Sequence, residues 1–300
     1  MKVDHHEHDE LKLNFKLNSK AVRDTSNVSG VPVKQSTPPA PGTHIGWPPV
    51  TTVHFRFYAE LNDFLAPWQR SRIFSQTCSR DASVKHMIEA LGVPHTEVEL
   101  ILVDGLSVDF AHRLADGEFV SVYPAFNTID VSPLVLLRPP HTRPARFIAD
   151  AHLGQLARNL RMLGFDVLYR NDYSDAEVAR IAAGEHRVVL TRDRDLLIRK
   201  EIVHGCYLHS VGCEEQLAEV LTRLELARSA QAFSRCLNCN GLLQAVAKRD
   251  VEHRVPLHSR MVYDRFYECQ GCLQVYWEGS HVARMRQRVE KMLGSSGTDG

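Results

Sequence analysis

Hydrophobic and polar positions follow two different rhythms along the chain, and these rhythms predict where strands and helices lie. Residues 53–58 alternate apolar and polar side chains, which is the period of a half-buried strand. Residues 83–92 place their apolar side chains on one face of a helix, which Gly92 is suited to end. The same patterns predict three further strands, at residues 72–76, 99–103 and 119–123.

The order of these elements resembles a ubiquitin-like β-grasp domain at residues 51–130. Residues 57–61 (Phe-Tyr-Ala-Glu-Leu) and 117–124 (Gly-Glu-Phe-Val-Ser-Val-Tyr-Pro) are similar to the sulfur-carrier branch of that fold. Those carriers end in a Gly-Gly pair whose carboxylate is activated, whereas this chain continues from Pro124 without one. The resemblance therefore implies a docking or regulatory module with a protein partner, rather than a sulfur carrier.

From residue 145 onward, short apolar strands alternate with amphipathic helices. This alternation predicts a parallel sheet with helices on its faces and with the carboxyl ends of the strands at one edge. The predicted helices cover 151–163, the segment from the capping box at Ser174 to Ala183, and 214–228. The predicted strands are 146–149, 166–169, 187–191 and 207–210.

Aspartates follow three of these predicted strands. Asp150 ends the first, Asp175 lies in the capping box after the second, and Asp193 and Asp195 follow the third. Gathered carboxylates repel one another and need a cation or protons. Carboxylate ligands suit Mg²⁺ or Mn²⁺, which can activate a water for phosphodiester hydrolysis. The sequence therefore predicts a catalytic metal site at this edge.

Four arginines accompany these acids and are expected to engage RNA phosphates: Arg158, Arg161, Arg192 and Arg194. A plainer interpretation of the third loop is a solvated turn in which Asp193 and Asp195 pair with the neighbouring arginines. Asp175 and Asp195 also suit the first turn of a helix, where the macrodipole favours an acid. Both interpretations remain open from the sequence.

Four cysteines form two Cys-x-x-Cys pairs separated by 29 residues: Cys236 and Cys239, then Cys269 and Cys272. Four thiolates at this spacing suit tetrahedral zinc, and a closed set of four protein ligands makes the site structural rather than catalytic. Two redox pairs are the alternative. The surrounding residues are basic and aromatic, so they either stack RNA bases or form the core of a small ribbon.

Longer motifs resemble the PIN-like RNase domain named after the C-terminal region of the Mut-seven exonuclease. They are Phe147–Asp166, Ser174-Asp175 and Leu190–Asp195, and the cysteine ribbon with Tyr276–His281 extends the resemblance over residues 146–285. A β-grasp unit in front of this domain is a common bacterial arrangement of the family. The resemblance implies a metal-dependent endo- or exoribonuclease, and the acids that match its motif are Asp150, Asp175, Asp193 and Asp195.

Composition and charge limit the remaining possibilities. The 300 residues are 44% hydrophobic and carry no formal net charge, which is ordinary for a globular protein with real cores. Residues 53–130 have a net charge of −5, and residues 233–292 have a net charge of +4, so the two ends differ in role or partner. No apolar run is long enough to span a membrane, and we expect a cytoplasmic protein. P-loop, dinucleotide-binding and serine-hydrolase motifs are absent.

We therefore expect an α/β protein in which a metal-dependent ribonuclease carries a structural zinc ion and a catalytic Mg²⁺ or Mn²⁺. One alternative is a non-catalytic RNA-binding or adaptor protein, and another is a β-grasp docking module related to sulfur carriers. The predicted organisation is a disordered tail (1–50), a β-grasp domain (51–130), a linker (131–144), a PIN-like parallel α/β/α domain (145–232), and a zinc ribbon with a terminal helix (233–292).

Overall fold

The computed structural model describes residues 50–126, 131–139 and 144–294. Residues 1–49 of the predicted tail lie outside these residues, as does part of the predicted linker, and Val50, the last residue of the predicted tail, begins a strand instead. The chain divides into two compact units, one comprising Met1–Met87 with Leu100–Pro124 and the other Ile88–Glu99 with Ala125–Gly300. Across the described ranges, no helix combines the length and apolar character needed to cross a membrane.

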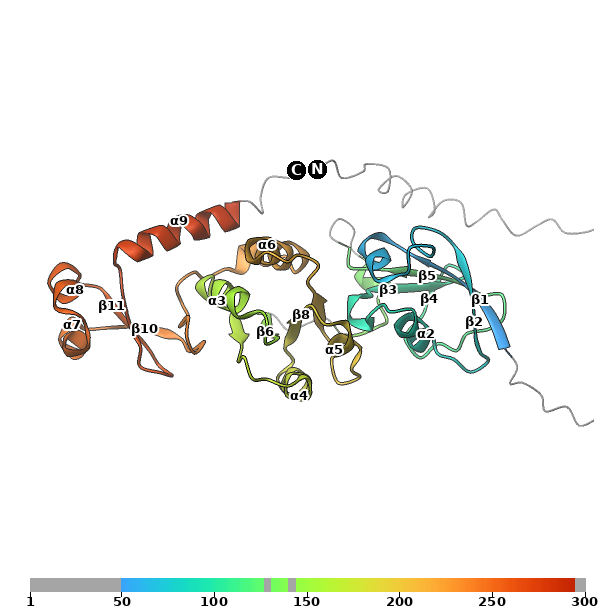
Figure 1. The fold of residues 1–300 in the computed structure, drawn as a ribbon, viewed down its shortest axis with the longest axis horizontal. Coiled ribbons are helices and arrows are strands. Elements are labelled where there is room, and N and C mark those ends of the chain that lie inside the picture. The colour runs from blue at the N-terminus through green and yellow to red at the C-terminus, as the bar shows by residue number, and fades with distance from the viewer. Residues whose placement is uncertain (1–49, 127–130, 140–143, 295–300) are drawn as a thin grey trace, which may run out of the picture. The chain divides into compact units, whose positions relative to one another are not determined.

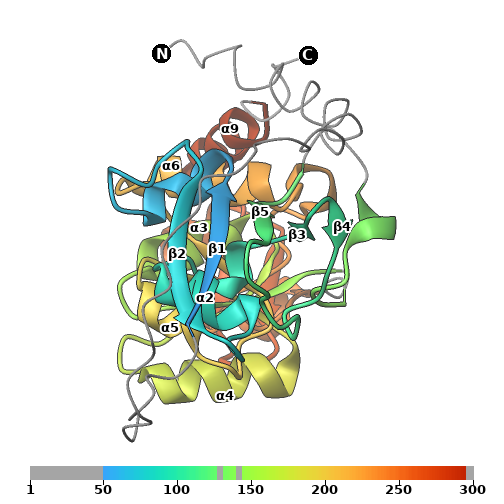
Figure 2. The ribbon, with the colours of Figure 1, turned by 90° about the vertical axis from the view of Figure 1, so that its right-hand side faces the viewer.

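The first unit is built on a five-stranded mixed sheet. Its strands are β1 (Val50–Phe57), β2 (Phe74–Ser79), β3 (Leu100–Val103), β4 (Leu106–Ser107) and β5 (Phe119–Tyr123), and α2 (Val84–Ala90) follows β2 along the chain. Figure 2 shows the strands side by side in the order β2-β1-β5-β3-β4. The first and last strands are parallel, whereas β2 and β3 are antiparallel to their partners β1 and β5. This topology confirms the predicted β-grasp fold.

The alternation in β1 determines which face of this sheet is buried. Val53, Phe55 and Phe57 are at most 1% exposed, and the polar residues between them are partly exposed. The rings of Phe55 and Phe57 stack at 6.0 Å, and Phe74 from β2 stacks on both. β2 begins two residues later than predicted, after Ser71 adopts a left-handed conformation with φ of 54°.

The second unit contains the predicted parallel sheet. β6 lies between β7 and β8, and β9 pairs with the outer side of β8, all in parallel. Helices α3 and α6 cover one face, and α4 and α5 cover the other (Figure 1). The elements are β6 (Arg146–Ala149), α3 (Gly154–Met162), β7 (Asp166–Leu168), α4 (Asp175–Glu185), β8 (Val188–Thr191), α5 (Arg194–Ile198), β9 (Gly205–Tyr207) and α6 (Cys213–Arg223).

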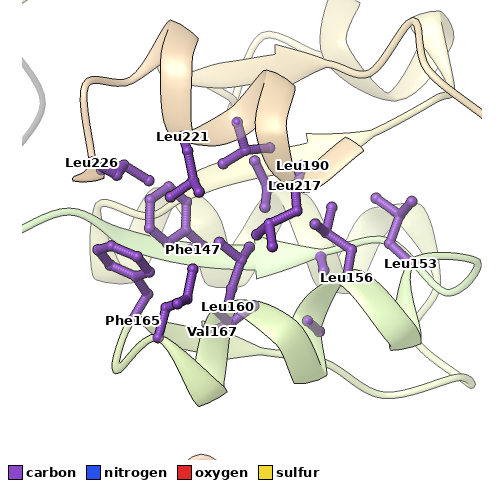
Figure 3. Packing of buried hydrophobic residues seen from close by; sticks show 14 of the residues in the cluster. Phe147, Leu153, Leu156, Leu160, Phe165, Val167, Leu190, Leu217, Leu221 and Leu226 are labelled. Atoms are coloured by element: carbon purple, nitrogen blue, oxygen red, sulfur yellow. The ribbon is translucent and has the colours of Figure 1, made fainter. Parts of the chain in front are cut away.

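Leucines from α3 and α6 meet the sheet in the larger of the two cores. Figure 3 shows Leu156 and Leu160 of α3 facing Leu217 and Leu221 of α6, with Phe147 of the inner strand β6 among them. All five side chains are at most 1% exposed. The 3.6-residue spacing that predicted these helices therefore corresponds to real burial on one face.

Three elements of this α/β domain differ from the prediction at their ends. β9 covers Gly205–Tyr207 rather than 207–210, because its partner β8 ends at Thr191, which pairs with Tyr207. α6 ends at Arg223 rather than at 228, because Glu225 has φ of 51° and Leu226 N returns to Leu221 O, which closes the helix. α3 begins at Gly154 rather than at 151, since Leu153 N bonds Asp150 O in a separate turn. That turn carries the first candidate acid.

A buried carboxylate forms hydrogen bonds at the outer edge of β9, where the strand has no neighbouring strand among the described residues. Glu97 lies in the segment Ile88–Glu99 of the second unit, and its side chain is 0% exposed. It accepts hydrogen bonds from Tyr207 N and from the Arg223 guanidinium, both at 2.6 Å. Arg223 also donates to Tyr207 O at 2.7 Å. Both outward backbone groups of Tyr207 are therefore paired, as a buried strand edge requires.

Replacing Glu97 with glutamine is expected to lower the free energy of unfolding by about 2–3 kcal/mol, because it removes a charge from two buried hydrogen bonds. Urea unfolding followed by circular dichroism measures the change. Asp264→Asn is the control, since Asp264 pairs with Lys248 but its side chain is 90% exposed, so a loss of less than about 0.5 kcal/mol is expected. Equal effects of the two substitutions would contradict a structural role for Glu97.

The C-terminal part of the second unit is a small antiparallel ribbon. Phe266 is 2% exposed and packs with Val251, Val255 and Val275, and Tyr263 and Trp277 lie against them. These three aromatic residues therefore form a core, in accordance with the plainer of the two interpretations. The elements are β10 (Leu243–Val246), α7 (Lys248–Val251), α8 (Leu257–Val262), β11 (Phe266–Cys269), β12 (Val275–Trp277) and α9 (Ser280–Gly294).

Candidate active site and metal centre

The carboxyl edge of the parallel sheet carries the candidate acids. Asp150 follows β6 directly, Asp175 is the first residue of α4 after β7, and Asp193 comes two residues after β8. Because β6, β7 and β8 are parallel, all three positions lie at the same edge. Ligands of open parallel sheets bind in the crevice beyond this edge.

A buried threonine links two of these acids. Thr191, the last residue of β8, is 0% exposed. Its hydroxyl donates to Asp150 Oδ2 at 2.8 Å and accepts from Asp193 N at 2.9 Å. Asp150 N also bonds Leu190 O at 3.0 Å. One hydroxyl thus holds the backbone of the β8 loop against the carboxylate that follows β6.

Replacing Thr191 with valine is expected to lower the free energy of unfolding by about 1–2 kcal/mol, because the isosteric side chain leaves the partly buried amide of Asp193 and a carboxylate oxygen of Asp150 without their partner. Thr191→Ser keeps the hydroxyl and is expected to retain most of the stability. Chemical denaturation of the three proteins measures the difference. A serine variant as unstable as the valine variant would show that packing, rather than the hydroxyl, explains the effect.

The other two acids stand at the starts of helices. Asp193 is the N-cap of α5, and its Oδ1 accepts from Asp195 N at 2.9 Å. Asp175 lies in the first turn of α4, beside a capping box formed by Ser174 and Glu177. Asp175, Asp193 and Asp195 are exposed, and Asp150 is half-buried. Exposed carboxylates on helix starts remain available to a hydrated ion, which keeps several of its waters.

The four aspartates do not converge as closely as the four cysteines do. Within the described residues, only the cysteine set brings three or more His, Cys, Asp or Glu ligand atoms within 4.8 Å of one another. Asp172, a further acid of the same edge, is bound instead to the Arg170 guanidinium, and both side chains are 59% exposed. The geometry therefore links Asp150 with Asp193 and leaves Asp175 and Asp195 as separate acids of the same edge.

The four cysteine thiols lie close enough together to hold one metal ion, since their Sγ atoms are all within 4.8 Å of one another. Cys239 and Cys269 have their Sγ atoms 3.3 Å apart, and Cys236 and Cys272 have theirs 3.6 Å apart. A zinc ion with Zn–S bonds of about 2.3 Å separates its sulfurs by about 3.8 Å, so small movements accommodate it. The four thiols can therefore hold a metal such as zinc, as the spacing predicts.

The surroundings of the thiols favour a bound cation. The Tyr276 hydroxyl lies 3.1 Å from Cys236 Sγ. Burial raises the pKa of Cys236, but hydrogen bonds from Tyr276 and from backbone amides lower it to about 7. A Cβ at Gly241 would lie 2.8 Å from Cys269 Sγ, so only glycine leaves room for this thiol. Burial raises the pKa of Cys239 and of Cys272, so without a cation the thiolate forms readily at Cys236, and a bound metal would supply the positive charge that the other two thiolates need.

Comparison with known protein families matches two parts of the chain. The profile of the Mut7-C RNAse domain matches residues 145–289, and that of the Mut7-C ubiquitin domain matches residues 50–130. Residues 145–289 are a Mut7-C RNAse domain. No curated protein matches the chain. The order of the two matches confirms the predicted family and the β-grasp domain in front of it.

Three of the four arginines predicted to bind RNA are exposed in the Mut7-C RNAse domain. Arg158 lies on α3, Arg192 lies in the loop after β8, and Arg194 is the first residue of α5. Arg192 and Arg194 flank Asp193, so their positive charges lie at the same edge as the acids. An RNA backbone at this edge would meet both carboxylates and guanidinium groups.

The structure places the fourth arginine elsewhere. Arg161 is 5% exposed, and its guanidinium donates to three backbone carbonyl oxygens, those of Val167, Leu237 and Asn238. Burial lowers the pKa of Arg161, and the negative charges of the cysteine site oppose that change. The predicted RNA contact does not fit this burial, since the side chain connects α3 to the cysteine ribbon instead. Its place in an amphipathic helix gave no sign of this role.

Two residues of these sites were missed from the sequence. Thr191 is the polar end of a predicted strand, and Asn240 directly follows the cysteine ligand Cys239, but the sequence patterns assigned no role to either residue. Both are polar residues with almost no exposure, at 0% and 6%. A polar residue that ends a buried strand, or that follows a metal ligand, can be recognised in a sequence. Its hydrogen-bond partner cannot, because Asp150 lies 41 residues from Thr191 and Val167 lies 73 residues from Asn240.

Proposed function

We propose that the Mut7-C RNAse domain of this protein is a metal-dependent ribonuclease that hydrolyses RNA phosphodiester bonds. The observation that carries this proposal is the link made by Thr191, which ties Asp150 to the loop of Asp193 at the carboxyl edge. A buried hydroxyl that bonds the Asp150 carboxylate and the backbone amide of Asp193 suits a site in which two acids from neighbouring loops must keep a defined spacing.

Asp150 and Asp193 are the residues that would hold the ion directly, with Asp175 and Asp195 binding it or its waters. Carboxylate oxygens alone suit Mg²⁺ or Mn²⁺. Such an ion supplies an activated water and stabilises the leaving oxygen in phosphodiester hydrolysis. Arg192 and Arg194 bind the phosphates on either side of the scissile bond, and Thr191 keeps Asp150 oriented. The four cysteines hold a structural zinc ion that takes no part in the chemistry.

Degradation of end-labelled RNA tests the proposal. Single-stranded and hairpin RNAs, labelled at the 5′ or the 3′ end, are incubated with zinc-loaded protein in buffer with or without Mn²⁺ or Mg²⁺. Omitting the added ion is preferable to adding EDTA, because EDTA also competes for the zinc of the cysteine site. Cleavage that requires the added ion supports the proposal, and the pattern of labelled products separates endonuclease from exonuclease attack.

A second candidate is a non-catalytic RNA-binding or adaptor protein. Asp175 and Asp193 already serve as helix-start residues, and the acids converge less closely than the cysteines. A domain without catalytic activity would show the same two features. RNA binding that persists with no cleavage under any added divalent ion would favour this second function.

The β-grasp domain serves the ribonuclease as a docking module for a protein partner. Its last strand, β5, continues through Pro124 with no Gly pair, so the chain lacks the terminus on which sulfur carriers are activated. A reducing compartment such as the cytoplasm is the expected location, since it keeps the cysteine thiols free for metal binding. Pull-down with residues 50–126 tests for the partner, and an RNA-dependent capture would argue against direct protein docking.

A further inference from the structure

The first cysteine pair forms a tight knuckle, defined here as residues 236–241. Cys236 N donates to Gly241 O at 2.8 Å, and Asn240 N donates to Cys236 O at 3.0 Å. These bonds close the loop around the two thiols Cys236 and Cys239. A metal held by these thiols therefore fixes the backbone of every residue between them.

Asn240 connects this knuckle to the edge strand β7. Its side chain is 6% exposed, and its Oδ1 accepts from Val167 N at 3.0 Å. Its Nδ2 donates to Asp166 Oδ1 at 2.8 Å. Burial raises the pKa of Asp166, but hydrogen bonds from Arg187 and Asn240 outweigh it, so the pKa is lowered and the acceptor stays charged. Asn240 has φ of 72°, a conformation that asparagine tolerates better than most residues.

Arg161 makes the second connection between the knuckle and the same strand residue. Its Nε donates to Val167 O at 2.9 Å, and its Nη1 donates to Asn238 O at 2.8 Å and to Leu237 O at 3.3 Å. Both backbone groups of Val167 are thus bonded to side chains that the knuckle holds. The side chain of Val167 points into the core beside Leu160 (Figure 3).

Tyr169, two residues after Val167, continues this chain of contacts to the acidic edge. Its hydroxyl donates to Ala151 O at 2.9 Å, next to Asp150. A Cβ at Gly154 would lie 2.6 Å from the same hydroxyl, so the ring packs directly on the start of α3. The turn from Asp150 to Leu153 is therefore held on one side by Thr191 and on the other by Tyr169.

We propose that Asn240 is a positioning residue through which metal binding at the four cysteines fixes β7 and, through Tyr169, the turn that carries Asp150. The metal stabilises the knuckle, the knuckle holds both backbone groups of Val167, and β7 places Tyr169 against Ala151. Because such coupling is reciprocal, loosening β7 also weakens metal retention. Only the effect on catalysis depends on the proposed ribonuclease function, because the coupling itself is measured without RNA.

Amide hydrogen exchange on the full chain, with zinc bound and after its removal, tests the coupling. Val167 N reports β7 directly, and Leu153 N, which bonds Asp150 O, reports the turn. Zinc removal from the wild type is expected to speed exchange at both amides by about tenfold or more. Without zinc the knuckle no longer holds this part of the chain, so local opening at both amides costs less free energy. Asn240→Gly is expected to show fast exchange with zinc still bound, and zinc removal then adds little. Glycine suits the left-handed backbone, so the variant removes the side chain without adding strain.

Asn238→Ala is the matched control, since Asn238 lies in the same knuckle, is exposed, and contacts Arg161 only through its backbone oxygen. It is expected to behave as the wild type does. Tyr169→Phe separates the last step, because it should loosen the turn while Val167 stays protected. Unchanged exchange at Val167 in zinc-free wild type, or equal protection in Asn240→Gly and Asn238→Ala, would overturn the proposal. If the protein cleaves no RNA but the coupling is observed, the proposed ribonuclease function fails and the proposed role of Asn240 stands.

Discussion

Asp150→Asn is expected to lower the rate of metal-dependent RNA cleavage by about a thousandfold or more, with little change in stability. Asparagine has the same shape and can still accept the hydrogen bond from Thr191, but its amide nitrogen cannot accept from Ala151 N, so the loss of stability stays near about 1 kcal/mol. It removes the negative charge that would hold Mg²⁺ or Mn²⁺, whose ligands are charged oxygens. A thousandfold loss corresponds to about 4 kcal/mol of transition-state stabilisation.

Asp193→Asn is expected to reduce cleavage in the same way while α5 stays capped, because asparagine is as good an N-cap as aspartate. Asp172→Asn is the control: this acid lies at the same edge but is exposed and paired with Arg170. Single-turnover cleavage of labelled RNA, with far-UV circular dichroism as the check on folding, measures all three variants. Full activity in Asp150→Asn, or an equal loss in Asp172→Asn, would remove the basis for the metal site.

The sequence predicted the parts of the fold that depend on local patterns. The alternation at residues 53–58 corresponds to the buried face of β1, and the run at residues 188–191 corresponds to β8, one of the two inner strands of the parallel sheet. Because parallel strands place their ends at one edge, the sequence also predicted which loops would carry the acids. Periodicity and connection rules are sufficient for this, since neither requires knowledge of which distant side chains meet.

Long-range polar contacts could not be predicted in the same way. Arg161 looks like an arginine on an amphipathic helix, yet its guanidinium is buried against residues 76 and 77 positions further along the chain. Asn240 and Glu97 are similar cases, since each satisfies a strand edge that is distant in sequence. A buried polar group must find a partner, but no local pattern tells which strand edge provides it.

The aromatic residues of the ribbon show how a plain interpretation can prevail over a functional one. Phe266 and Trp277 could have offered stacking surfaces to RNA bases. Phe266 instead belongs to a cluster of four buried residues, against which Trp277 packs. A ribbon of three short strands has little apolar surface of its own, so its bulky side chains are needed inside. This small core also means that the ribbon depends strongly on its metal.

Removal of zinc is therefore expected to unfold residues 233–280. Structural zinc contributes about 10–16 kcal/mol of apparent binding energy to small domains. Four buried apolar side chains contribute about 6–12 kcal/mol, which is too little to offset the conformational entropy lost on ordering the ribbon. Stepwise chelation, with released zinc measured colorimetrically and ribbon structure followed by limited proteolysis, tests this expectation. One equivalent of zinc should be released as the ribbon becomes cleavable, and re-addition of zinc should restore its protection.

A double variant, Cys236→Ser with Cys269→Ser, is expected to lose zinc altogether, because it removes one thiolate from each Cys-x-x-Cys pair. Cys213→Ser is the matched control: this cysteine lies outside the cluster, and a serine hydroxyl can still accept the hydrogen bond from Asn159 Nδ2. Full zinc content in the double variant would place the metal elsewhere in the chain. A zinc-free ribbon that resists proteolysis would show instead that its apolar core is sufficient without the metal, and the coupling through Asn240 would then lose its source.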